Sequence, residues 1–161
     1  MAEEKFKKGS IHDVTVKPLV KFIDERGWLA ELFRADETDS ELMPAMAYIS
    51  MTQPGIARGP HEHLEQTDWF CFMGPSNFKV YLWDTRKDSP TCGIRQVIFA
   101  GSDSPRMVIV PPGIVHAYRN IGTENGTVFN APNRLYGGDG KKSPVDEIRH
   151  EDLPGSPFQL D

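Results

Sequence analysis

The chain has 161 residues, enough for one domain with a single hydrophobic core. Its formal net charge is −5, so no basic face is expected to dominate the surface. This disfavours nucleic acid as the main partner. No stretch reaches the roughly 20 apolar residues of a membrane span, and the charged start MAEEKFKKGS is unlike a signal peptide. Two cysteines are too few for a disulfide-stapled secreted domain. We therefore expect a cytoplasmic protein with free thiols.

Short apolar runs bounded by Gly, Pro or Asp predict a chain of β-strands after a charged, frayed tail at residues 1–10. The runs lie at 14–33 (two strands around a turn at 24–27), 46–53, 67–74, 78–84, 94–101, 106–113 and 126–132. Residues 35–44 indicate one helical turn, and SPVDEIRH at 143–150 predicts a short helix with Ser143 as its N-cap. This pattern is typical of an all-β sandwich or barrel with one or two short helices, and it predicts a single domain over 1–161.

The stretch ARGPHEHLEQTDW, residues 57–69, contains two histidines one residue apart. On a strand, His61 and His63 point to the same face. They are candidates for a metal-binding pair, for a base with a substrate-binding neighbour, or for ordinary surface histidines. For any single histidine the last interpretation is the natural one.

A second stretch, VPPGIVHAYRN at 110–120, adds His116 to the pattern. The spacing Gly55-x5-His61-x-His63-x4-Asp68-x5-Gly74, followed by Pro111-x-Gly113-x2-His116-x3-Asn120, resembles the two signature motifs of the cupin superfamily. This resemblance implies a jelly roll, or double-stranded β-helix, in which the three histidines and Asp68 converge in the barrel mouth. Neutral imidazoles with a carboxylate can bind a transition metal, or act as a general base without one.

Five segments point to one family within the cupin superfamily: DERGWLAELF (24–33), ARGPHEH (57–63), WDTRKDSPTCG (83–93), VPPGIVHAY (110–118) and NRLYGG (133–138). In this order they resemble the dTDP-4-dehydrorhamnose 3,5-epimerase (RmlC-like) family over residues 14 to 152. The resemblance implies a metal-free isomerase that acts beside the keto group of a nucleotide-linked 4-keto-6-deoxy sugar, with a role in polysaccharide synthesis. It also implies a homodimer that exchanges an N-terminal strand, here around residues 14–23.

The resemblance also implies roles for individual residues. His61 takes the position of the base, His116 lies near the sugar, and Arg58 contacts the diphosphate. Further substrate-binding residues are expected at Arg26 and Glu31, which contact the nucleotide end across a dimer interface, and at Tyr118 and Tyr136. Asp84 and Arg86 of the WDTR motif are expected to stabilise the barrel rather than contact the ligand.

Three departures from the family pattern concern proton transfer. Asn130 stands where the family's acid is a tyrosine, and Thr67 lies near the position of a lysine that holds the keto oxygen. The aspartate that usually pairs with the base lies in a segment beyond residue 161, so Asp68 is the nearest candidate to orient His61. His63 replaces a glutamine, and either His63 or His116 is expected to shuttle or return the proton.

The RGxHxH feature also occurs in 3,4-ketoisomerases acting on dTDP-4-keto-6-deoxyglucose, so keto migration on the same substrate class is an alternative to epimerisation. A second alternative is a metal-dependent cupin that binds one divalent transition metal through His61, His63, Asp68 and His116. A third is a nucleotide-sugar-binding module without catalysis, because Asn130 is a poor proton donor.

Overall fold

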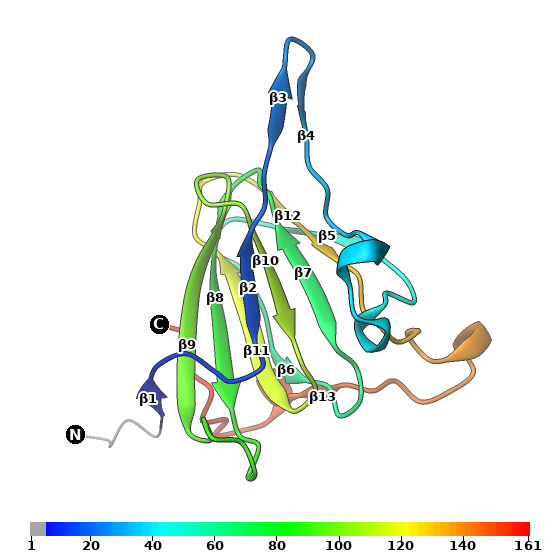
Figure 1. The fold of residues 1–161 in the computed structure, drawn as a ribbon. Helices are drawn as coiled ribbons and strands as arrows, with labels where there is room; N and C mark the ends of the chain where they lie inside the picture. Colours follow the sequence, from blue (N-terminus) through cyan, green and yellow to red (C-terminus); the bar gives the residue numbers. More distant parts are fainter. Residues whose placement is uncertain (1–5) are drawn as a thin grey trace.

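Strands supply most of the regular structure in the computed structural model, which describes residues 6–161 (Figure 1). The thirteen strands are β1 (Lys7–Lys8), β2 (Thr15–Pro18), β3 (Phe22–Asp24), β4 (Gly27–Leu29), β5 (Tyr48–Thr52), β6 (Ala57–Glu62), β7 (Asp68–Phe72), β8 (Asn77–Asp84), β9 (Ile94–Gly101), β10 (Arg106–Val110), β11 (Ile114–Asn120), β12 (Gly126–Asn130) and β13 (Ile148–Arg149). Four three-residue 3₁₀ helices complete the described part: η1 (Ala35–Glu37), η2 (Ser40–Leu42), η3 (Asp139–Lys141) and η4 (His150–Asp152).

Two facing sheets form the barrel. The six-stranded sheet has the order β1-β9-β8-β11-β6-β13, and the five-stranded sheet has the order β2-β10-β7-β12-β5. Strands that are neighbours in the sequence mostly belong to different sheets, which is the topology of the jelly roll predicted from the sequence. The two histidine-containing strands, β6 and β11, pair directly, as the predicted convergence of the two motifs requires.

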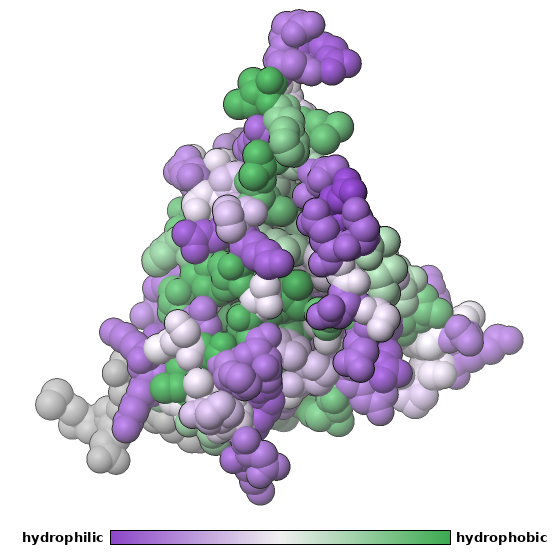
Figure 2. All heavy atoms as spheres, viewed as in Figure 1, coloured by the Kyte–Doolittle hydropathy of each residue, from purple (hydrophilic) through white to green (hydrophobic). Residues whose placement is uncertain are grey.

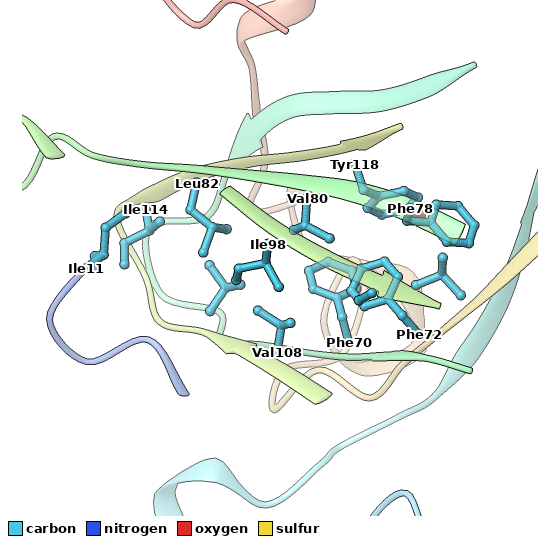
Figure 3. Packing of buried hydrophobic residues seen from close by; sticks show 13 residues of the cluster. Ile11, Phe70, Phe72, Phe78, Val80, Leu82, Ile98, Val108, Ile114 and Tyr118 are labelled. Carbon is cyan, nitrogen blue, oxygen red and sulfur yellow. The ribbon is translucent and has the colours of Figure 1, made fainter. Parts of the chain in front are cut away.

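The core lies between the two sheets (Figure 3). Phe70 and Phe72 of β7 face Phe78, Val80 and Leu82 of β8, and each of these side chains is at most 4% exposed. The alternate residues of β8 are also buried, because Tyr81 and Trp83 pack with Phe158 of the C-terminal segment. The expectation that both faces of residues 78–84 are covered is therefore confirmed.

Asp84 and Arg86 also behave as predicted from the sequence. The Asp84 carboxylate is fully buried and accepts hydrogen bonds from Arg86, Ser89 and Thr91. These bonds tie the connection between β8 and β9 to the barrel. Cys71 is buried and Cys92 is exposed, and the two thiols are not paired.

The prediction of a helix at 143–150 is wrong. Residues 143–147 have no regular structure, and β13 and η4 follow them. The Asp146 carboxylate, instead of capping a local helix, accepts backbone hydrogen bonds from Leu64, Glu65 and Gln66 at 2.8–3.0 Å. These long-range bonds override the local helix signal, as tertiary contacts commonly do.

The predictions for residues 35–44 and for the N-terminal tail can be compared with the structure in the same way. The helical turn expected at 35–44 appears as η1 and η2. Of the predicted frayed tail, residues 1–5 lie outside the described residues, whereas Lys7–Lys8 forms β1 and pairs in parallel with β9. Within residues 6–161, no helix is long and apolar enough to span a membrane.

The β3–β4 hairpin projects from the barrel (Figure 1). Its shaft exposes four large apolar residues, which are 54–80% exposed: Phe22, Ile23, Trp28 and Leu29. Figure 2 shows hydrophobic surface on this projection below a hydrophilic tip. β2, just before the hairpin, pairs with β10 of the same chain. Within the segment 14–23 predicted to cross to a partner, Thr15–Pro18 therefore belongs to its own sheet, and the hairpin is the part that extends away.

Candidate active site

A cavity of about 750 Å³ opens where β5, β6 and β11 meet the segment 132–151. Five residues predicted from the sequence line it: Arg58, His61, His63, Tyr118 and Tyr136. Three others lie buried behind its wall, since Asp68, His116 and Asn130 are only 1–3% exposed. The structure thus brings eight of the ten predicted site residues into one region.

The pairing of β6 with β11 places His61 directly opposite His116. Their ring centroids are 4.5 Å apart, and the His63 ring lies 5.8 Å from His61 and 5.7 Å from His116. The close approach of the two strands depends on Gly59, which has a φ of +82°. A Cβ atom there would come within 2.6 Å of the His116 carbonyl oxygen, so only glycine fits.

Asp68 lies at the centre of the polar network. Its Oδ2 atom lies at ion-pair distance from both rings, 3.1 Å from Nε2 of His63 and 3.0 Å from Nε2 of His116. Its Oδ1 atom accepts hydrogen bonds from Gln66 and Asn130 at 2.8 and 2.9 Å. Burial alone raises the pKa of Asp68, but the contacts with His116 and His63 outweigh burial and bring the pKa well below its usual range.

The expectation that Asp68 orients His61 is therefore wrong. Asp68 projects from β7 of the five-stranded sheet, and its carboxylate is occupied by His63, His116, Gln66 and Asn130. Proximity in sequence to His61 does not bring the two side chains together, because the Asp68 carboxylate crosses from β7 to the His63 and His116 rings instead.

His61 and His63 lie in opposite electrostatic situations. Burial, followed by the neighbouring His116 and His63 rings, lowers the pKa of His61 to about 2, so the ring is neutral at physiological pH. For His63, burial lowers the pKa, but Asp68 and the Asp146 carbonyl raise it more, to about 9. Within residues 6–161 neither ring nitrogen of His61 has a hydrogen-bond partner, whereas His63 contacts Asp68 through Nε2 and the Asp146 carbonyl through Nδ1. His61 is therefore the imidazole available to a substrate.

Tyr48 connects the cavity to this network. The Asn130 side-chain nitrogen donates to both Asp68 and the Tyr48 hydroxyl, the latter at 3.0 Å, while the Asn130 oxygen accepts from the Trp69 backbone at 2.9 Å. Burial of the hydroxyl is the main reason why the pKa of Tyr48 rises to about 12. The phenol is thus protonated at neutral pH, and it belongs to the wall opposite His61, because β5 lies in the five-stranded sheet.

Two predicted residues lie elsewhere. Arg26 is at the tip of the β3–β4 hairpin, with its side chain 84% exposed and paired with Asp24. Glu31 pairs with Arg34 and lines a second cavity of about 310 Å³ beside Trp69. In a single chain neither residue reaches the histidine cluster.

Comparisons with known proteins agree with this architecture. The family model described as dTDP-4-dehydrorhamnose 3,5-epimerase matches residues 8–141. The chain belongs to this family. It is 40% identical over 129 residues to the probable low-salt glycan biosynthesis epimerase Agl13 of Haloferax volcanii. The aligned region covers 79% of this chain and 81% of Agl13. It is 39% identical over 113 residues to the spore coat polysaccharide biosynthesis protein SpsL of Bacillus subtilis, with 70% and 73% coverage.

Solved structures show the same fold. A dTDP sugar isomerase from Desulfovibrio desulfuricans superposes with a TM-score of 0.79 at 22% identity, covering 92% of this chain and 91% of that one. RmlC from Legionella pneumophila, solved with dTDP-4-keto-L-rhamnose, superposes with a TM-score of 0.74 at 18% identity, covering 88% and 74%. Membership of the epimerase family makes the chain an isomerase-type enzyme with an RmlC-like cupin fold.

Sequence reasoning about this epimerase-family chain missed Tyr48, Gln66 and Asp146. A signal existed for Tyr48: Tyr48, Ser50 and Thr52 alternate in an otherwise apolar run, as polar residues that face a cavity do. No local signal existed for Asp146, because its partners lie about 80 residues earlier in the chain.

Proposed function

We propose that the chain epimerises a dTDP-linked 4-keto-6-deoxy sugar by proton abstraction beside the keto group, without a metal. One observation carries the proposal: His61, at the family's base position, is neutral, faces the cavity and has no hydrogen-bond partner within the described residues. A base needs a free lone pair within reach of the substrate proton. His61 meets this requirement, whereas both nitrogens of His63 are engaged.

In the proposed reaction His61 takes the proton from a carbon that the adjacent carbonyl makes acidic, and an enolate forms. The buried group of Asp68, His63 and His116 is the second part of the machinery. The raised pKa of His63 keeps its ring protonated beside Asp68 at neutral pH, so His63 is not a second base and His61 alone accepts the substrate proton. Asn130 holds Asp68 in place rather than acting as an acid.

The nucleotide diphosphate is proposed to bind at the mouth of the cavity, near Arg58 and Tyr136, while Tyr118 lies deeper on its wall. Arg58 is held by bonds to the Thr52 hydroxyl and the Met51 carbonyl, which orient its guanidinium for a phosphate. Arg26 and Glu31 are proposed to complete the nucleotide site of a second chain in a homodimer. The exposed apolar shaft of the hairpin supports this arrangement, because burial against a partner removes that surface from water.

The names of the two relatives support a place in glycan or polysaccharide synthesis. The sugar is proposed to be an activated precursor for such a polymer.

The decisive experiment supplies dTDP-4-keto-6-deoxyglucose in deuterated water and follows C3 and C5 by NMR. Deuterium incorporation with inverted configuration supports the proposal. A new keto position would identify a 3,4-ketoisomerase instead. Tight dTDP binding with no exchange at any sugar carbon would identify a catalytically silent binding module.

One observation favours a second candidate, a metal-dependent cupin. The potential ligand atoms of His61, His63 and His116 all lie within 4.8 Å of one another, and three imidazoles suit zinc, iron or nickel. Asp68, the fourth residue of that set, faces His63 and His116 directly. Elemental analysis of protein purified without added metal separates the candidates: about one metal per chain, lost in His63→Ala, would support the metalloprotein.

A further inference from the structure

The proposed epimerisation leaves one role without a residue. Inversion at a carbon requires that the proton leaves from one face of the sugar and that another proton arrives at the opposite face. The family pattern assigns the second task to a tyrosine, and this chain has Asn130 at that position. An amide N–H is far too weak an acid for the step, so the proton must come from another group on the wall opposite His61.

The structure places a phenol directly beside Asn130. β5 and β12 pair so that Tyr48 stands opposite Asn130, and the two side chains are 3.0 Å apart. The Asn130 oxygen accepts from the Trp69 backbone, which fixes the amide so that its nitrogen faces Tyr48. The Tyr48 oxygen is therefore the acceptor of this bond, and its own hydrogen has no protein acceptor within residues 6–161.

Position in the cavity agrees with the role. Tyr48 lines the same cavity as His61, and the residue remains 44% exposed overall. His61 belongs to the six-stranded sheet and Tyr48 to the five-stranded sheet, so a sugar bound between the sheets has one group on each side. Burial of the hydroxyl keeps the phenol protonated, as an acid must be before the reaction.

We propose that Tyr48 is the general acid of the reaction and that Asn130 is its positioning residue, so that the tyrosine of the family has moved to the neighbouring strand. The inference rests on the proposed epimerase function. His61 takes the proton, and the electrons of the broken C–H bond form the enolate. The Tyr48 O–H bond then breaks, its proton forms the new C–H bond on the other face, and a phenolate remains. Water carries the proton from the His61 imidazolium back to the phenolate, so no external acid is consumed.

The test separates proton exchange from inversion. With dTDP-4-keto-6-deoxyglucose in deuterated water, Tyr48→Phe should still wash deuterium into recovered substrate, because His61 can return a deuteron to the face it deprotonated. Inverted product should fall by roughly 10²–10⁴, the usual contribution of a general acid. Inversion at the wild-type rate would overturn the assignment, and so would equal loss of exchange and inversion, which would place Tyr48 at the deprotonation step.

Two further variants support the measurement. Tyr136→Phe removes another cavity hydroxyl and should change KM without changing the ratio of exchange to inversion. The double variant Tyr48→Asn/Asn130→Tyr returns the phenol to the family's strand and should recover inversion relative to Tyr48→Phe; no recovery in a variant that still binds dTDP would count against the relocation. A wild-type enzyme that shows no exchange with the substrate would refute the proposed function itself, whereas normal wild-type inversion with an unaffected Tyr48→Phe would refute only this inference.

Discussion

Asp146 joins the cavity wall to the histidine cluster, and its removal should affect both stability and activity. The carboxylate accepts three backbone hydrogen bonds, at 2.8 Å from Leu64, 2.8 Å from Glu65 and 3.0 Å from Gln66. A hydrogen bond to a charged group contributes about 1.5–3 kcal/mol to stability, and a buried donor that loses its partner adds a desolvation cost. The 64–66 turn is at most half-buried, so water replaces part of the loss in Asp146→Ala. We expect the free energy of unfolding to fall by about 2–3 kcal/mol, less than the sum of three buried bonds.

Urea unfolding at pH 7 measures this change, and Asp139→Ala is the matched control. Asp139 is exposed in η3, and within the described residues its side chain accepts no hydrogen bond, so its removal should cost less than about 0.5 kcal/mol. Asp146→Ala keeps the backbone carbonyl that contacts His63, but the segment that carries this carbonyl loses its three carboxylate bonds, so the His63 ring should be held less firmly and kcat should also fall. Equal unfolding free energies for the two variants would refute the reasoning.

The same bonds predict a pH dependence for stability. Burial raises the pKa of Asp146, but the three backbone donors lower it more, so the net value lies below the ordinary 3.8. A carboxylate with a depressed pKa stabilises the fold above its unfolded pKa, and this contribution is lost as the pH falls through the folded value. The stability difference between wild type and Asp146→Ala should therefore shrink below about pH 4.

Three further predictions concern function. His61→Asn should keep dTDP affinity and lower solvent exchange at the sugar carbon by roughly 10²–10⁴, whereas His63→Asn should affect exchange less; equal losses restored by added divalent metal would favour the metalloprotein. Arg58→Ala should raise KM and leave kcat nearly unchanged, because a diphosphate contact is equal in the ground and transition states; a fall in kcat alone would place Arg58 at the reacting carbons. Light scattering at micromolar concentration should give about twice the 18.1 kDa mass of one chain, and a monomer would exclude hairpin exchange.

Much of the fold could be predicted because its signals are local. Each strand run ends at Gly, Pro or Asp, and the two-sided apolar pattern of 78–84 identified a strand covered on both faces. The histidine cluster was also predictable, since the spacing of two motifs on paired strands brings His61 opposite His116. The strand signals lie within about a dozen residues each, whereas the cluster was predicted from the resemblance of the motifs at 55–74 and 111–120 to the cupin pattern.

The predictions that were wrong or missed depend on contacts between residues far apart in the sequence. The 143–150 segment carries a good helix start, but Asp146 gains three bonds from residues about 80 positions away, and no helix periodicity records them. Asp68 is near His61 in sequence, yet its carboxylate crosses from β7 to the His63 and His116 rings instead. Pairing of β5 with β12, which brings Tyr48 to Asn130, likewise depends on the order of strands in the closed barrel.

The division of the site between the two sheets bears on which isomerisation occurs. Keto migration moves a proton between neighbouring carbons, and two groups on one wall suffice for it; His61 and His63 lie in this relation, 5.8 Å apart on one side of the cavity. In this chain, however, both His63 nitrogens are engaged, which removes the second group from that wall. The two groups proposed to transfer protons, His61 and Tyr48, both line the cavity but belong to different sheets. A base and an acid on opposite walls favour inversion over migration, because each reaches a different face of the sugar bound between them.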